Sequence, residues 1–208
     1  MSSVLDTYAR KAISFTKGEG SFLYTEKGDK YLDWIAGIAT NILGHCHPHV
    51  SKAIQDQSKK LIHVSNAVII KEAESLAKRI TDNTFADKVF FCNSGAESVE
   101  GAIKIVRRYF HTIGKPEKNR LVSFSGAFHG RTLAALFLAN NKSHTEGFGP
   151  KVEGFDQVPF GNHEALKKSI NKNTAAIICE PVQGEGGVRV VPDYCLKGLR
   201  EICDEHGI

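Results

Sequence analysis

The sequence lacks any long apolar run. Its longest runs, such as residues 133–139, are far shorter than the ~20 apolar residues that a membrane-spanning helix needs. Residues 1–17 mix charged and apolar side chains and contain no signal-peptide core. These absences argue against membrane insertion and secretion, and the cysteine pattern described next predicts a cytoplasmic protein.

Cysteine is scarce and its pattern is irregular. The chain has five cysteines, an odd number, with no C-x-x-C pair: Cys46, Cys92, Cys179, Cys195 and Cys203. A disulfide framework is therefore disfavoured. We expect reduced, mostly buried thiols, because a free cysteine behaves as a small hydrophobic residue.

Clusters of one charge are also missing. The formal net charge is +4 with nine histidines counted as neutral, and no run of Lys and Arg forms a basic stripe. Nucleic-acid binding is therefore disfavoured. The 208 residues are 41% hydrophobic and 24% charged, as in an ordinary globular protein, and could hold one large domain or two small ones.

The first part of the chain differs from the rest. β-Forming residues at 21–25 and 31–33 flank a polar turn at 26–30, which predicts a β-hairpin. Residues 44–48 then interrupt the chain, and amphipathic helices are expected over residues 50–61 and 70–80. We expect a domain boundary near residue 50, with residues 1–50 as an N-terminal segment and residues 51–208 as part of a larger domain.

Strands and helices alternate regularly from residue 88 onward. Strands are expected over residues 88–92, 121–124 and 175–179, and helices over residues 96–110, 132–138, 162–171 and 192–205. The strands are apolar on both faces, which predicts an α/β fold with a mostly parallel sheet covered by helices on both faces. Because Ile208 stands where a further strand is expected, we interpret the sequence as truncated and expect this part alone to fold poorly.

The loops after the expected strands carry the candidate binding residues, since ligands of such sheets bind at the carboxyl ends of the strands. After the first strand, Ser94, Gly95 and Ala96 open a helix whose free N–H groups suit a phosphate, although many tight turns contain Ser-Gly. The loop matches neither the dinucleotide-binding nor the P-loop pattern.

Residues 125–132 form the second loop. Phe128 could cover the face of a planar ring, and Arg131 could hold a carboxylate through two hydrogen bonds. The alternative is a core phenylalanine and a surface arginine.

Residues 180–187 form the third loop, in which Glu180 and Glu185 flank a glutamine. A carboxylate pair for acid–base catalysis is one interpretation, and a turn capped by its own acids is the other. His45, Cys46 and His47 suggest a metal site at first sight. Their crowding into one short loop, with no second ligand group at a suitable spacing, disfavours it.

Together these motifs resemble the class III, ornithine-type aminotransferases among the fold-type I enzymes that depend on pyridoxal 5'-phosphate (PLP). The resemblance covers nearly the whole chain in order, at residues 18–20, 31–33, 44–48, 91–97, 128–132, 147–150 and 180–187. Within the class, residues 63–66, 91–97 and 146–150 are most similar to the acetylornithine branch.

The resemblance implies roles for individual residues. Gly95 and Ala96, with Ser94 beside them, would hold the cofactor phosphate, Phe128 would stack on the pyridine ring, and Glu180 would lie near that ring. Arg131 would bind the substrate α-carboxylate. Glu185 resembles the acid that pairs with a later arginine and lets one site accept both an amine-bearing and a dicarboxylic substrate. Residues 1–50 would belong to a small domain of the complete enzyme and residues 51–208 to its PLP-binding large domain.

The resemblance also implies residues that this chain does not contain. An aspartate that pairs with the pyridine nitrogen, and a later lysine that forms the Schiff base, would lie beyond Ile208. Lys104 and Lys142 do not match that position. No catalytic residue is therefore assigned in this chain, which alone would be inactive.

The implied activity is transfer of the δ-amino group of N-acetylornithine to 2-oxoglutarate, a step of arginine biosynthesis, by a homodimer. Ornithine, succinylornithine or 4-aminobutyrate are alternative amino donors. A non-catalytic fragment and a nucleotide-binding α/β protein are the alternatives from other classes.

Overall fold

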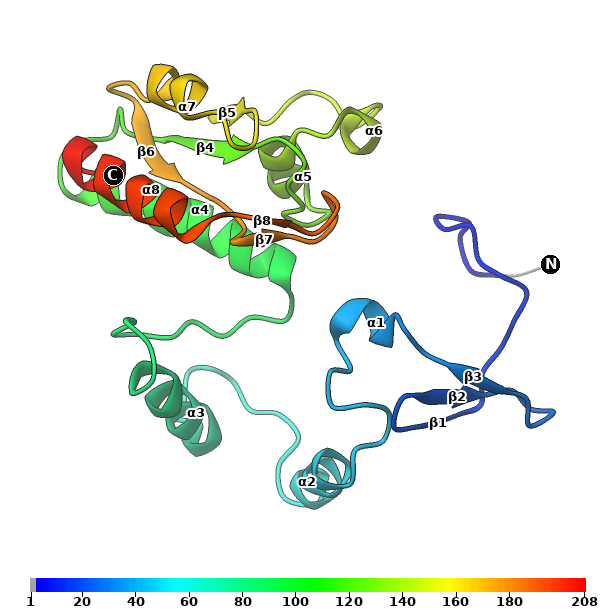
Figure 1. Cartoon of the computed structure of the whole chain (residues 1–208). Coiled ribbons are helices and arrows are strands. Elements are labelled where there is room, and N and C mark those ends of the chain that lie inside the picture. The colour runs from blue at the N-terminus through cyan, green and yellow to red at the C-terminus, as the bar shows by residue number, and fades with distance from the viewer. Residues whose placement is uncertain (1–2) are drawn as a thin grey trace. The chain divides into compact units, whose positions relative to one another are not determined.

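The computed structural model describes residues 3–208, and the chain divides into two compact units, Met1–Asp87 and Lys88–Ile208. Their elements are labelled in Figure 1. The expectation that residues 1–50 belong to a small domain of the complete enzyme stays a prediction.

The first unit contains a small antiparallel sheet. Its strands, in the order β1-β2-β3, are β1 (Lys17–Glu19), β2 (Phe22–Tyr24) and β3 (Lys30–Leu32). The predicted hairpin is confirmed as β2 and β3, whereas β1 was not predicted because it is short and contains a glycine. The helices that follow are α1 (Ala36–Ala39), α2 (Pro48–Ser58) and α3 (Lys71–Thr81), and the last two agree with the prediction within a few residues.

The second unit is built on a parallel sheet. Its central strand is β4 (Arg120–Phe124), with β5 (Phe155–Val158) on one side and β6 (Thr174–Ile177) on the other, both parallel to it. The helices are α4 (Gly95–Thr112), α5 (Leu133–Ala139), α6 (Lys142–Thr145), α7 (His163–Ser169) and α8 (Asp193–His206). A separate hairpin joins β7 (Val182–Gln183) to β8 (Arg189–Val190).

Both faces of this sheet are covered, as predicted. Leu121 and Val122 are neighbours in β4 and point to opposite faces, because side chains alternate along a strand. Leu121 packs in a cluster with residues of α4 and α5, whereas Val122 packs with residues of α7 and α8. The two side chains are 1% and 0% exposed, so β4 is the centre of the core.

The predicted strand at residues 88–92 is absent. The segment is irregular, and Phe90 and Phe91 are 67% and 45% exposed. A strand needs a neighbour to accept and donate its backbone hydrogen bonds, and none of the described strands pairs with these residues. Its apolar composition alone could not supply that neighbour.

The prediction of mostly buried cysteines is wrong. Cys46 and Cys92 are exposed, Cys179 and Cys195 are half-buried, and only Cys203 is buried. Cys92 belongs to the segment that lacks a sheet partner, and Cys46 lies in a turn with a positive φ of 54°.

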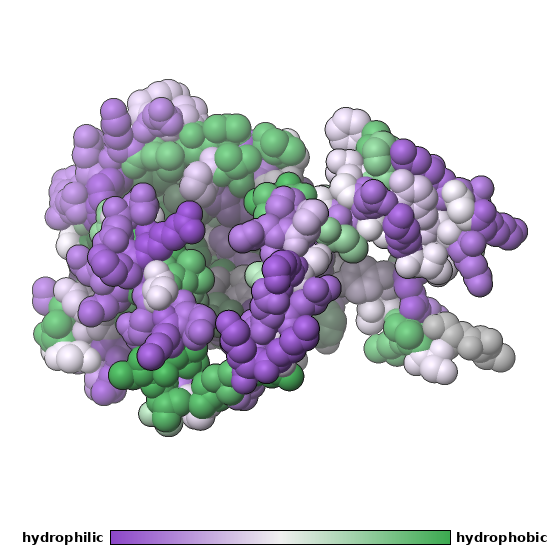
Figure 2. Space-filling view, turned by 90° about the horizontal axis from the view of Figure 1, so that it is seen from below, coloured by the Kyte–Doolittle hydropathy of each residue, from purple (hydrophilic) through white to green (hydrophobic). Residues whose placement is uncertain are grey.

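Many apolar side chains lie at the surface of the molecule. Figure 2 shows apolar residues in green beside hydrophilic residues in purple. None of the helices within residues 3–208 is long and apolar enough to cross a membrane.

Candidate functional site

The candidate site is built from the three loops that the sequence analysis singled out. One precedes α4, one follows β4, and one follows β6. Since β4 and β6 are parallel, their carboxyl ends lie at the same edge of the sheet, where such folds bind ligands.

The start of α4 offers an anion-binding position. Ser94 caps the helix by accepting a hydrogen bond from the amide of Glu97 at 3.2 Å, and the Glu97 carboxylate accepts one from the amide of Asn93 at 2.6 Å. The amides of Gly95 and Ala96 have no acceptor within the described residues. A Cβ added to Gly95 would meet nothing within 4 Å. Two free N–H groups and open space at the positive end of an 18-residue helix fit a phosphate.

The loop after β4 packs directly on this helix start. Gly130 has a φ of 119°, and a Cβ added to it would stand 2.7 Å from the Cβ of Ala96 and 2.9 Å from its Cα. The hydroxyl group of Thr132 donates a hydrogen bond to the Glu100 carboxylate in α4. Only glycine allows this close approach, which joins the first two loops.

The second and third loops meet at Phe128. The amide of Phe128 donates a hydrogen bond to Oε2 of Glu180 at 3.1 Å, and the Arg131 guanidinium lies 5.3 Å from the centre of the Phe128 ring. Phe128 is 39% exposed and is therefore not a core residue, while Arg131 is exposed. The structure thus places an accessible aromatic ring and an exposed guanidinium group side by side.

Burial shifts the pKa of two groups here. Burial raises the pKa of Glu180, and the hydrogen bond from Phe128 and the charge of Arg189 both oppose that rise. Burial lowers the pKa of His129, which is 6% exposed and whose Nε2 atom has no hydrogen-bond partner within residues 3–208. His129 is therefore expected to be a neutral ring at neutral pH.

The acids of the third loop do not cap their own turn, so that alternative is wrong. Glu180 accepts its hydrogen bond from Phe128, and Glu185 is exposed and makes no hydrogen bond or ion pair in the described part of the chain. The turn is held instead by Gln183 and Arg189, which are partners across the β7–β8 hairpin. Arg189 was not among the predicted site residues, because its only local signal is its position after a glycine-rich turn.

The histidine-rich segment of the first unit has a structural role. His45 Nε2 lies 2.7 Å from Oδ2 of Asp33, and the His45 backbone exchanges two hydrogen bonds with Gly20. The hydrogen bond from His45 is the main reason why the pKa of Asp33 is lowered. Within residues 3–208, no group of three or more His, Cys, Asp or Glu side chains could hold a metal ion.

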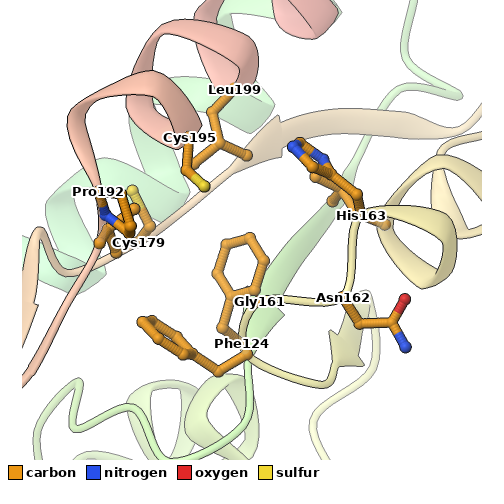
Figure 3. Close-up of a pocket in the computed structure, with 11 residues that line it drawn as sticks. Phe124, Gly161, Asn162, His163, Cys179, Pro192, Cys195 and Leu199 are labelled. Carbon is orange, nitrogen blue, oxygen red and sulfur yellow. The ribbon is translucent and has the colours of Figure 1, made fainter.

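A separate small cavity lies between β4, α7 and α8. It has a volume of about 60 Å³, and Figure 3 shows Phe124, Cys179, Cys195 and Leu199 around it. Although Asn162 and His163 also line it, its exposed surface is almost wholly apolar and offers little to orient a polar substrate. The three loops, and not this cavity, form the candidate site.

Known proteins are similar to this chain in both sequence and fold. The acetylornithine aminotransferase of Agrobacterium fabrum is 55% identical over 205 residues, which are 99% of this chain and 51% of that protein. The acetylornithine aminotransferase of Methanopyrus kandleri is 43% identical over 206 residues, 98% of this chain and 51% of that protein. The chain spans about half the length of the curated relatives it matches.

Solved structures of aminotransferases have the same fold as this chain. The ornithine aminotransferase of Toxoplasma gondii ME49 superposes with a TM-score of 0.93 at 29% identity, over 99% of this chain and 49% of that chain. A second structure of that enzyme, crystallized in the presence of oxidized glutathione, has PLP at partial occupancy in its active site and superposes with a TM-score of 0.92 at 29% identity, with the same coverage. The sequence model of the class-III aminotransferase family matches residues 6–208. The chain therefore belongs to the class-III aminotransferases.

Proposed function

We propose that the protein containing this chain is a PLP-dependent aminotransferase that moves the δ-amino group of N-acetylornithine to 2-oxoglutarate, as a step of arginine biosynthesis. The observation that carries the proposal is the convergence of the open α4 start, the accessible Phe128 ring and Glu180 in one place. The relatives named acetylornithine aminotransferase support the choice of substrate.

The described residues fit PLP. The amides of Gly95 and Ala96 would hold the phosphate with Ser94 beside them, the ring of Phe128 would stack on the pyridine ring, and Glu180 would lie near that ring. When bound, PLP supplies an electron sink for the substrate carbon that carries the amino group. This chain's own residues bind and orient the cofactor, and Gly130 keeps the Phe128 loop close to the phosphate position.

Substrate recognition falls to two exposed charges. Arg131 is free to pair with a carboxylate, and its guanidinium rests against Phe128, so the substrate would be held next to the cofactor ring. Glu185 has no partner in the described part of the chain. It would pair with an arginine supplied by the rest of the protein when the amine binds, and release it when the dicarboxylic acid binds.

The proposal extends to assembly and location. We expect a homodimer in the cytoplasm, from the family resemblance. All five cysteines are free, which suits a reducing compartment. Sedimentation of the full-length protein should give twice the mass of one chain, and a monomer that is active would contradict the dimer.

The decisive experiment compares amino donors. With the full-length protein and 2-oxoglutarate, kcat/KM should be higher for N-acetylornithine than for ornithine or succinylornithine. A strong preference for 4-aminobutyrate would overturn the choice of substrate. The Arg131→Gln variant should lose at least about tenfold in kcat/KM, because a charge-assisted carboxylate contact is removed.

The solved ornithine aminotransferase favours free ornithine as the second candidate donor.

Two further measurements separate the remaining alternatives. Titration with PLP, ATP and NAD distinguishes an aminotransferase from a nucleotide-binding protein. The DNA downstream of codon 208 distinguishes an enzyme from a non-catalytic fragment, since a reading frame that continues to the expected aspartate and lysine supports the enzyme.

A further inference from the structure

Arg189 lies between two loops of the candidate site and is not among the residues assigned to the cofactor or the substrate. Its Nη2 atom donates hydrogen bonds to the carbonyl oxygen of Ser125 at 2.8 Å and to Oε1 of Gln183 at 2.5 Å. Nε2 of Gln183 donates to the same Ser125 carbonyl at 3.3 Å. The three residues form a closed triangle, and Gln183 is only 1% exposed.

Two glycines beside this guanidinium, Gly126 and Gly186, have no room for a side chain. A Cβ added to Gly126, whose φ is 80°, would stand 1.9 Å from Nη2 of Arg189. A Cβ added to Gly186 would stand 2.6 Å from the carbonyl oxygen of Gly126. The turn at residues 125–126 and the turn at residues 184–187 therefore approach each other closely, with Arg189 joining them.

A third contact ties this arrangement to the end of β5. The guanidinium carbon of Arg189 lies 4.6 Å from the centre of the Phe160 ring, and the amide of Phe160 donates a hydrogen bond to Oγ of Ser125 at 3.2 Å. A planar guanidinium can stack on a ring and donate in its own plane, which the ammonium group of a lysine cannot do. This is a role for an arginine in particular.

We propose that Arg189 is a positioning residue, which holds the turn that leads to Phe128 at a set distance from the turn that carries Glu185. Phe128, which would face the cofactor ring, and Glu185, which would select the substrate, are then held at a fixed distance from each other. Because bound groups need close alignment, a shift of this spacing lowers kcat/KM for the second substrate even though Arg189 touches neither ligand. The inference rests on the proposed function for the roles of Phe128 and Glu185.

Hydrogen exchange in the cofactor-free, full-length protein tests the contact itself. The amides of Ser125, Ala127 and Phe128 report on the loop, since they donate to Val158, Phe124 and Glu180. In Arg189→Gln these amides should exchange about tenfold to a hundredfold faster, because a charge-assisted hydrogen bond is lost. Arg189→Lys should fall between Arg189→Gln and the unchanged protein.

Arg200→Gln is the matched control, because this exposed arginine pairs with Asp204 on α8, outside the three loops. It should leave the three amides unchanged. Equal acceleration at the core amide of Val122 in Arg189→Gln would show general destabilisation and overturn the proposal. So would unchanged exchange of the three amides.

Kinetics then separate positioning from stability. Arg189→Gln should raise KM for 2-oxoglutarate about tenfold, with a smaller change in kcat, because alignment of Glu185 governs how the second substrate is accepted. An unaltered KM would overturn the proposal. The exchange measurement needs no catalysis. If the full-length protein without substitutions is inactive, the proposed function is refuted, but hydrogen exchange still tests the role of Arg189.

Discussion

The two units of this chain contain similar elements but differ in their cores. Among the described residues of Met1–Asp87 none is buried, and Trp34, Ile38 and Phe85 are 88%, 86% and 102% exposed. In Lys88–Ile208 two apolar clusters fill both faces of the sheet. Abundant apolar residues alone therefore do not produce a core.

The difference comes from the range of the contacts. In the first unit, β1, β2 and β3 are consecutive hairpin strands, which close through short turns. In the second unit, β4 pairs with two strands from later in the chain, and helices from before, between and after these strands cover the faces. Contacts distant in sequence bury a central strand on both sides, and that burial contributes most of the stabilising free energy.

The largest expected effect is on hydrogen exchange. In the full-length protein, the amides of Val122 and Ser123 in β4 should be protected at least about a thousandfold more than the amide of Leu23 in β2, since exchange there needs opening of the core. Mass spectrometry of peptides from both units measures this. Equal protection would show that the first unit is as stable as the second.

Substitution of matched leucines gives the next largest effect. Leu121→Ala should reduce the free energy of unfolding by about 2–5 kcal/mol, because it leaves a cavity in a buried cluster. Leu43→Ala, at a side chain that is 61% exposed, should change it by less than about 0.5 kcal/mol. Urea denaturation compares the two, and a similar loss for Leu43→Ala would mean that this leucine is covered in solution.

A glycine pair tests the site of the second unit. Gly130→Ala should weaken PLP binding by the full-length protein at least about tenfold, because backbone strain of about 1–3 kcal/mol is added and the new Cβ would push against Ala96. Gly114→Ala is the control, since Gly114 also has a positive φ, 75°, but an added Cβ meets nothing within 4 Å. Fluorescence titration measures both, and equal affinities would contradict the close packing.

The smallest expected effect concerns the first unit and pH. The hydrogen bond from His45 lowers the pKa of Asp33 in the folded chain. The contact therefore stabilises the fold at pH values above the pKa of Asp33 in the unfolded chain, about 3.9, and this stabilisation is lost as the pH falls through the lower pKa of the folded chain. The amide signal of Gly20 should report this loss by NMR at acidic pH. Asp33→Asn should lack the transition, and an identical transition in that variant would assign it to another group.

Much of the fold could be predicted from local pattern. The helix α4 has an apolar face and a serine cap, and α8 ends at Gly207 in the left-handed conformation. These signals lie within a few residues of each other. The strand β5 was missed because Asp156 and Gln157 interrupt its apolar pattern, although both of its ends, Phe155 and Val158, are buried.

The candidate site could likewise be predicted only in part. Phe128, Glu180 and the start of α4 could be found because each follows or precedes an expected strand or helix. Their mutual contacts could not be predicted, since they join loops about 30 to 50 residues apart. Arg189 was missed because its importance lies in contacts with Ser125 and Phe160, which no local pattern encodes.

The sequence by itself determined the family, the alternation of strands and helices, and the residue types at the three loops, because these depend on local pattern and ordered motifs. Tertiary structure alone decided which apolar segments are buried, why residues 88–92 form no strand here, and how Arg189 joins two loops. The physical reason is that burial and hydrogen-bond pairing require partners distant in the chain. A segment's own composition cannot supply them.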